Sequence, residues 1–255
     1  MNRARTGAVV RKELADIRRS RFVVITMLAI PLVYVSIPVF LLLTQNSSAT
    51  STQLAQVAGG VLTDLMLVPL LIPVFIATSS VVGEREQGTL EPVLTTPVRR
   101  EEILTGKAVA CAIPAIGVTY LMMGAVFAII AVFAMPAAAS AVWHAPELPV
   151  DIVFVPLLAA WSIWVGVAIS AKASDIRVAT QLGALGTLPA IGFIILADVK
   201  VISSTLLMVI VLGAVLLVLD IGAYRVVSRL FNTERLITGT KPIRAGKSRF
   251  RDAPV

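Results

Sequence analysis

Charged residues are scarce in this chain, and their scarcity excludes a soluble globular domain. Only 15% of the residues are Asp, Glu, Lys or Arg, and 57% are hydrophobic, whereas soluble domains carry roughly 25% charged residues. The mean hydropathy of +0.91 is correspondingly high. The composition therefore predicts an integral membrane protein.

Cysteine and histidine occur once each, which excludes most metal and redox sites. Cys111 has no second thiol with which to form a disulfide or a thiolate metal site, and it lies in an apolar run. We expect it to be a small buried packing residue. His144 has no second imidazole with which to share a metal, so we expect no metal site.

The motifs of nucleotide-binding and hydrolytic enzymes are missing as well. Gly246-Lys247-Ser248 has the ending of a P-loop, but Lys241 occupies the place of the first glycine and no apolar strand precedes it. Gly-x-Ser-x-Gly, His-Glu-x-x-His and Cys-x-x-Cys do not occur. We therefore expect no catalytic residue and no cofactor bound by this chain.

Long apolar runs dominate the sequence, and six of them have roughly the 20 residues needed to cross a bilayer. We place the spans at approximately 22–43, 60–82, 108–135, 152–171, 178–197 and 201–222. Residues 44–58 and the small-residue stretch after Pro136 are expected to be outer loops. The predicted fold is thus an all-α membrane protein with a single transmembrane domain, 1–255, and both termini on one side.

The positions of Lys and Arg orient these spans. All but one of the 22 basic residues lie in the leader 1–21, between spans two and three, at Lys172 and Arg177, or in the tail 225–255. Because basic residues mark the cytoplasmic side, we expect both termini in the cytoplasm and the protein in the plasma (inner) membrane. The net charge of +7 is then explained by the orientation of the spans and by attraction of the basic segments to anionic lipid. We therefore expect no nucleic-acid partner.

The leader predicts a helix lying along the inner membrane surface. Val10, Leu14 and Ile17 share one helical face, and basic residues occupy the other. A disordered basic arm is the alternative. A secretory signal peptide is disfavoured, because an apolar core as long as 22–43 exceeds the roughly 7–15 residues of such peptides. The tail is expected to be flexible and to stay near anionic lipid.

Acidic residues are nearly absent from the spans. Asp64 lies at the outer mouth of the second span and Asp220 at the inner end of the sixth. We expect interfacial or helix-end carboxylates, with a role in a transport pathway as the alternative. The lack of charge at mid-span argues against ion-coupled secondary transport. Gly183 and Gly186 give the fifth span a close-packing face.

One polar stretch, Gly83–Lys107, separates two apolar spans and carries five acids and four bases. Within it, Leu90, Val93 and Leu94 share one helical face, and Pro97 ends the helix. This pattern predicts a short amphipathic helix that docks a cytoplasmic partner. An interfacial helix resting on lipid is the alternative.

Three motifs in this stretch resemble the signature of type-2 ATP-binding-cassette exporter permeases. They are Glu84-Arg85-Glu86-x-Gly88-Thr89-Leu90-Glu91, Thr96-Pro97-Val98 and Glu102-Ile103-Leu104-x-Gly106-Lys107. Six spans with both termini inside also fit this family. The chain departs from the family at Pro92-Val93, where members often have a charged or polar residue followed by leucine. It also lacks the large outer domain that some members insert after the first span.

The resemblance implies a coupling helix, between spans two and three, that fits a groove on an ATPase. The expected interface comprises Glu84, Arg85, Glu86, Gly88, Thr89, Leu90, Glu91, Val93, Leu94 and Pro97. It also implies two separate P-loop ATPase subunits, which hold the ATP and magnesium, and a second permease copy, identical or not. The expected function is export of a hydrophobic drug or lipid-like molecule; a non-transport scaffold and an ion-exporting permease are the alternatives.

Overall fold

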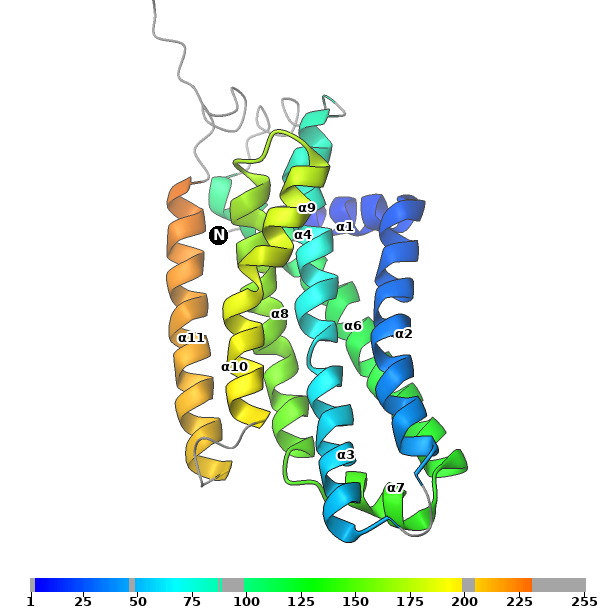
Figure 1. Cartoon of the computed structure of the whole chain (residues 1–255). Coiled ribbons are helices and arrows are strands. Elements are labelled where there is room, and N and C mark those ends of the chain that lie inside the picture. Colours follow the sequence, from blue (N-terminus) through cyan, green and yellow to red (C-terminus); the bar gives the residue numbers. More distant parts are fainter. Residues whose placement is uncertain (1–2, 46–48, 87, 89–98, 199–204, 231–255) are drawn as a thin grey trace, which may run out of the picture.

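The computed structural model describes residues 3–45, 49–86, 88, 99–198 and 205–230. Throughout these ranges the chain forms helices and no β-strand, as the sequence predicts. The helices are α1 (Arg3–Arg19), α2 (Arg21–Leu43), α3 (Ser51–Leu65), α4 (Val68–Glu86), α6 (Arg100–Phe133), α7 (Pro136–Trp143), α8 (Leu148–Ser170), α9 (Ile176–Gly186), α10 (Leu188–Asp198) and α11 (Thr205–Leu230). The long helices lie side by side, α1 crosses one end of the bundle, and α7 lies at the other (Figure 1).

Four described stretches are long and apolar enough to cross a bilayer. They are Val23–Leu43, Ser51–Glu84, Glu101–Phe133 and Leu148–Ser170. They correspond to the first four predicted spans and make the chain a multi-pass membrane protein. Spans five and six stay predictions. Residues 178–197 are divided between α9 and α10 at Thr187, and α11 covers most of 201–222.

Two predicted loops are wrong. Residues 51–58 are helical, because Thr50 forms a capping box with Gln53: the Gln53 N–H donates to Thr50 Oγ1 at 3.4 Å, and the Thr50 N–H donates to Gln53 Oε1 at 3.0 Å. The stretch after Met135 is also helical, because Pro136 occupies the first turn of α7, where its missing N–H costs nothing. The two helices pack against each other.

Helix α11 continues past Arg225, where the predicted cytoplasmic tail begins, to Leu230, and the side of the membrane on which the tail lies stays a prediction. Residues 231–255 lie outside the described ranges. The described chain begins in α1 and ends in α11 at the same end of the bundle (Figure 1).

Helix α4 lies at the centre of the packing, in contact with α2, α6, α8 and α9. Two glycines allow its neighbours to approach closely. A Cβ atom at Gly166 of α8 would lie 2.6 Å from Ala77 Cβ, and one at Gly183 of α9 would lie 2.6 Å from Thr78 Cγ2. The close-packing face predicted for the fifth span is therefore present, with Gly183 against α4 and Gly186 against Val165 of α8.

Candidate functional site

The leader helix α1 packs across the start of α6, and a glycine permits the contact. A Cβ atom at Gly106 would lie 2.6 Å from Val9 Cγ1, closer than van der Waals contact allows. Ser20 then caps α2 by accepting the Val23 N–H at 3.4 Å, so the chain turns directly into the first span. The predicted leader helix is confirmed, and one of its faces lies against protein.

Lys107 of α6 is only 1% exposed and lies at the centre of a buried ionic cluster. Its Nζ lies 2.8 Å from Glu13 Oε1 of α1 and 2.8 Å from Glu84 Oε2 of α4. It also donates to the Ser80 carbonyl oxygen at 3.0 Å. An ammonium has three donors, and these three oxygens surround it. The cost of burying this charge is thereby offset.

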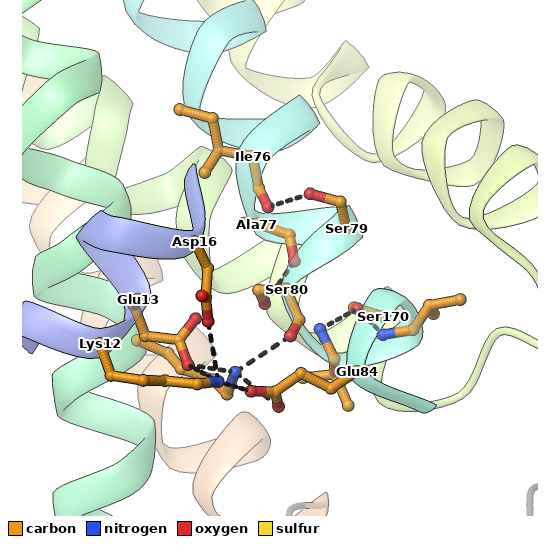
Figure 2. Close-up of polar contacts among 12 residues, drawn as sticks. Lys12, Glu13, Asp16, Ile76, Ala77, Ser79, Ser80, Glu84 and Ser170 are labelled. Atoms are coloured by element: carbon orange, nitrogen blue, oxygen red, sulfur yellow. Dashed lines mark hydrogen bonds and ion pairs between the residues drawn. The ribbon is translucent and has the colours of Figure 1, made fainter. Parts of the chain in front are cut away.

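Lys12 of α1 adds a second cation to the cluster. Its Nζ lies 3.2 Å from both Glu13 Oε1 and Asp16 Oδ2, and it also contacts Glu84 Oε1. Figure 2 shows these α1 side chains facing Glu84 at the end of α4. Burial lowers the pKa of Lys12, but the hydrogen bond and charge of Glu84 and the charge of Glu13 outweigh burial and raise it. Lys12 is therefore charged at neutral pH.

The cluster joins three segments that are distant in sequence: α1, the end of α4 and the start of α6. The last two are the ends of the polar stretch Gly83–Lys107. Removing one partner of a buried ion pair destabilises the folded protein by about 3–5 kcal/mol, because the other charge is left buried without a partner. The two ends of the stretch are thus joined to each other and to the leader helix by ion pairs.

Helices α8 and α9 are tied to the same end of α4. Ser170 Oγ donates to the Thr78 carbonyl oxygen at 2.7 Å and accepts the Val81 and Val82 N–H groups at 3.1 Å each (Figure 2). Glu86 Oε1 accepts the Ile176 N–H at the start of α9, at 3.1 Å. The end of α4 is thus hydrogen-bonded to both α8 and α9.

An apolar pocket lies near this end of the bundle, between α2, α4 and α9. Three hydroxyl groups stand among its otherwise apolar lining. The lining residues are Val23, Thr26, Met27, Ile72, Phe75, Ile76, Ser79, Ile176 and Thr180. Such a lining suits a molecule that is mostly apolar and has a few polar atoms.

Comparison with protein-family models decides the family. The model described as "ABC-2 family transporter protein" matches residues 7–201, which is more than half of the 255-residue chain. The chain belongs to the ABC-2 transporter family. The match runs from α1 through α10 and includes every residue of the ionic cluster. No curated protein matches the chain.

The family's signature stretch is described only at its two ends. Glu84 is 8% exposed and turned into the ionic cluster, whereas Glu86 and Gly88 are exposed. Gly88 has a φ of 68°, a left-handed conformation that favours glycine. Arg85 belongs to α4. Outside the described residues lie Thr89, Leu90, Glu91, Val93, Leu94 and Pro97, so the coupling helix of this ABC-2 chain stays a prediction.

The two membrane-edge carboxylates lie apart from the ionic cluster. Asp64 is half-buried in α3. Asp220 is buried within α11, which continues beyond it to Leu230, so it does not lie at the helix end; its position at the membrane interface stays a prediction. Asp220 Oδ1 has no hydrogen-bond partner among the described residues. Over the same part of the chain, no group of three His, Cys, Asp or Glu side chains could hold a metal.

Sequence reasoning missed most of the ionic cluster. It singled out Glu84 and assigned it to a partner interface, but it gave no role to Glu13 or Asp16 and no internal contact to Lys107. The one available signal was the pair of acids inside a basic leader, with Lys12 and Asp16 at i, i+4. Nothing in the spacing links the leader to the start of the third span.

Proposed function

We propose that this ABC-2 family protein is the membrane subunit of an ABC exporter. Separate P-loop ATPase subunits, two per transporter, would bind ATP and magnesium and dock on the polar stretch Gly83–Lys107. A second permease copy would complete the transporter. The observation that carries this proposal is the buried ionic cluster, which holds both ends of that stretch against the leader helix.

In this proposal the cluster transmits the motion of the ATPase to the spans. ATP shifts the equilibrium between inward-open and outward-open states only if the ATPase contacts the permease differently in its ATP-bound and nucleotide-free forms. A docked helix on a loosely attached loop would move alone. Because Lys107 joins α6 to α1 and to α4, displacement of the loop instead moves three helices together. Glu84 is in this view a positioning residue, and Glu86 and Gly88 face the partner.

The apolar lining of the pocket between α2, α4 and α9 suits a hydrophobic or lipid-like substrate, but the cavity is only ≈ 20 Å³, so the three helices would have to separate to admit one. It is lined by the starts of α2 and α9 and by the middle of α4, so it lies in the half of the bundle that contains the cluster. On the orientation given by the basic residues, this is the cytoplasmic side. We propose that an amphiphilic molecule loads here from the inner leaflet, its polar atoms meeting Thr26, Ser79 and Thr180.

The test is ATP-driven flux in vesicles that contain this protein and its ATPase. The expected result is ATP-dependent movement of a fluorescent lipid analogue or hydrophobic dye away from the ATPase side. Leu90→Asp should abolish both flux and permease-stimulated hydrolysis, because it places a charge on the predicted docking face, while membrane insertion persists. Binding of the ATPase without flux of any probe would instead favour a scaffold. Flux of inorganic ions alone would favour an ion-exporting permease.

A further inference from the structure

We propose that the contact between α8 and α11 is a binding site for an ammonium group carried on an apolar molecule, with the Asp220 carboxylate as its counter-ion. Aromatic side chains of both helices complete the site. The inference goes beyond the proposed function, because it concerns binding in the absence of any ATPase, so either can fail without the other.

Two contacts give the register of α8 and α11. A Cβ atom at Gly213 of α11 would lie 3.6 Å from Phe154 Cζ of α8. Further along both helices, the ring centroids of Trp164 and Tyr224 lie 5.2 Å apart. The contacts come in the same order along the two helices, so α8 and α11 run in the same direction.

This register places Asp220 level with Trp161. Asp220 comes one helical turn before Tyr224, and Trp161 comes about one turn before Trp164. Trp161 packs against the apolar cluster that contains Leu216, on the turn of α11 before Asp220. The level is close to the middle of α8, which is long and apolar enough to cross a bilayer. Asp220 therefore lies deeper than the interface position that the sequence predicts.

Both side chains have a buried polar atom without a partner. Asp220 is only 8% exposed, and its Oδ1 has no hydrogen-bond partner among the described residues. The Nε1 of Trp161 is buried in the same way. None of the ion pairs within the described ranges includes Asp220. A carboxylate deep in a membrane is costly unless a cation or a hydrogen-bond donor accompanies it, and such residues mark functional sites.

Asp151 shows why Asp220 stands out. Asp151 is 5% exposed, and its Oδ2 also has no partner in the part of the chain that the structure describes. It lies in the first turn of α8, where the positive end of the helix dipole favours a carboxylate. Asp220 lies in the interior of α11 and gains nothing of this kind. Its charge is left for a ligand to neutralise.

The surroundings favour an organic cation over a metal ion. Calcium needs six to eight oxygen ligands, and the described residues contain no group of three His, Cys, Asp or Glu side chains that could hold a metal. The rings of Trp164 and Tyr224 meet edge to face one turn from Asp220. Aromatic ring faces attract ammonium groups, and the Trp161 N–H can donate to the carboxylate.

The position of α11 indicates that the ligand is amphiphilic. Helix α11 lies at one side of the bundle (Figure 1) and makes its main contact with α8. Leu217, Val218 and Ile221, on either side of Asp220 in sequence, are exposed. The contact between the two helices therefore borders lipid, and a molecule that enters from there needs an apolar body. A cationic amphiphile and the headgroup of an aminolipid share this chemistry.

The simpler explanation is a structural hydrogen bond from the Trp161 N–H to Asp220. Asparagine accepts such a bond as well as aspartate does, but it cannot neutralise an ammonium group. The two explanations therefore differ in what Asp220→Asn does to the binding of a cation.

The experiment measures binding to the purified full-length protein in neutral maltoside micelles. The probe is a dansyl-labelled octyltrimethylammonium, and its neutral analogue has a carbon atom in place of the nitrogen. Energy transfer from tryptophan to dansyl reports binding, since Trp161 and Trp164 lie at the site. The test variant is Asp220→Asn, and the matched control is Asp151→Asn, which changes a second buried carboxylate. Thermal unfolding first establishes that both variants are folded.

We expect the wild type to bind the cationic probe at least about tenfold more tightly than the neutral analogue, because the buried carboxylate pairs with the charge. Asp220→Asn should lose this preference, and Asp151→Asn should keep it. The comparison of the two probes on the wild type needs no variant. Equal binding of both probes to the wild type, a cationic preference that survives Asp220→Asn, or an equal loss in Asp151→Asn would overturn the inference.

A second series separates the two sources of the ammonium group. Dioleoylphosphatidylethanolamine is added to the micelles, and dioleoylglycerol, which has the same acyl chains and no amine, is the control. Displacement of the cationic probe by the aminolipid alone assigns the site to a lipid headgroup. Equal effects of the two lipids assign it to a free cationic amphiphile. Since no ATPase is present, failure of this inference leaves the proposed function intact.

Discussion

The two ends of this molecule are held together by different kinds of contact. At the end with α1, charged side chains join segments far apart in the chain; Lys107 and Glu13 are 94 positions apart. At the opposite end, α3 packs on α7 with an apolar core between them, and no ion pair joins the described residues there. The Thr50–Gln53 capping box is local, and Tyr120 Oη of α6 donates to the Ile152 carbonyl oxygen of α8 at 2.9 Å. In the proposed mechanism, the motion of the ATPase therefore passes through the α1 end, where ion pairs join helices that are distant in sequence.

The largest expected effect is from Lys107→Met, which removes the cation shared by Glu13 and Glu84. Two buried carboxylates would then lose this partner, at a cost of about 3–5 kcal/mol. We expect a large fall in the thermal unfolding temperature of the purified protein. Lys12→Met is the comparison, since Lys12 is partly exposed and its loss leaves both Glu13 and Glu84 paired with Lys107, so we expect a smaller fall. Similar unfolding temperatures for the two variants would show that Lys107 is not the main cation of the ionic cluster.

Gly106→Ala is expected to have an intermediate effect. The added Cβ atom would lie 2.6 Å from Val9 Cγ1, so α1 must move off α6, at a cost of about 1–3 kcal/mol. Gly124→Ala in the same helix is the control, because nothing lies within 4 Å of a Cβ atom there, and alanine favours a helix. Thermal unfolding of both variants checks this, and an equally stable Gly106→Ala protein would show that α1 is not held as described.

The smallest effect is expected at the opposite end, from Thr50→Ala. Loss of this N-cap should cost about 1 kcal/mol of stability and leave ATP-driven flux unchanged, because α3 begins far from the ionic cluster. Measuring unfolding and flux on the same preparation separates the two quantities. A folded Thr50→Ala protein with impaired flux would mean that the opposite end also transmits force.

The sequence indicated the helices more reliably than the contacts between them. The helix start at Arg100 was predictable, since Glu102 accepts the Arg99 N–H at 3.1 Å in a local capping pattern. The small residues around Gly183 likewise predicted close packing, although not that the neighbour is α4. Residues 51–58 and the stretch after Pro136 were misassigned as loops. Short runs of Ser, Thr and Gln, and small residues after a proline, occur in loops and in helix N-termini alike.

The candidate site was predictable only in part, for a physical reason. Hydrophobic periodicity identifies a face of one helix, but it contains no information on which face of another helix lies opposite. The pairing of Glu13 with Lys107 depends on the angle at which α1 crosses α6, and Val9 and Gly106 set that angle. Only the structure places these residues together.

The most direct test of the account is the number of substrate molecules exported per ATP hydrolysed by Glu84→Gln in vesicles. This variant keeps the shape of the side chain and removes the charge that faces Lys12 and Lys107. We predict that it inserts and still binds the ATPase, and that flux per ATP falls several-fold, because the loop no longer moves α1, α4 and α6 together. Unchanged flux per ATP in a folded, ATPase-bound Glu84→Gln protein would contradict the claim that the ionic cluster transmits the motion.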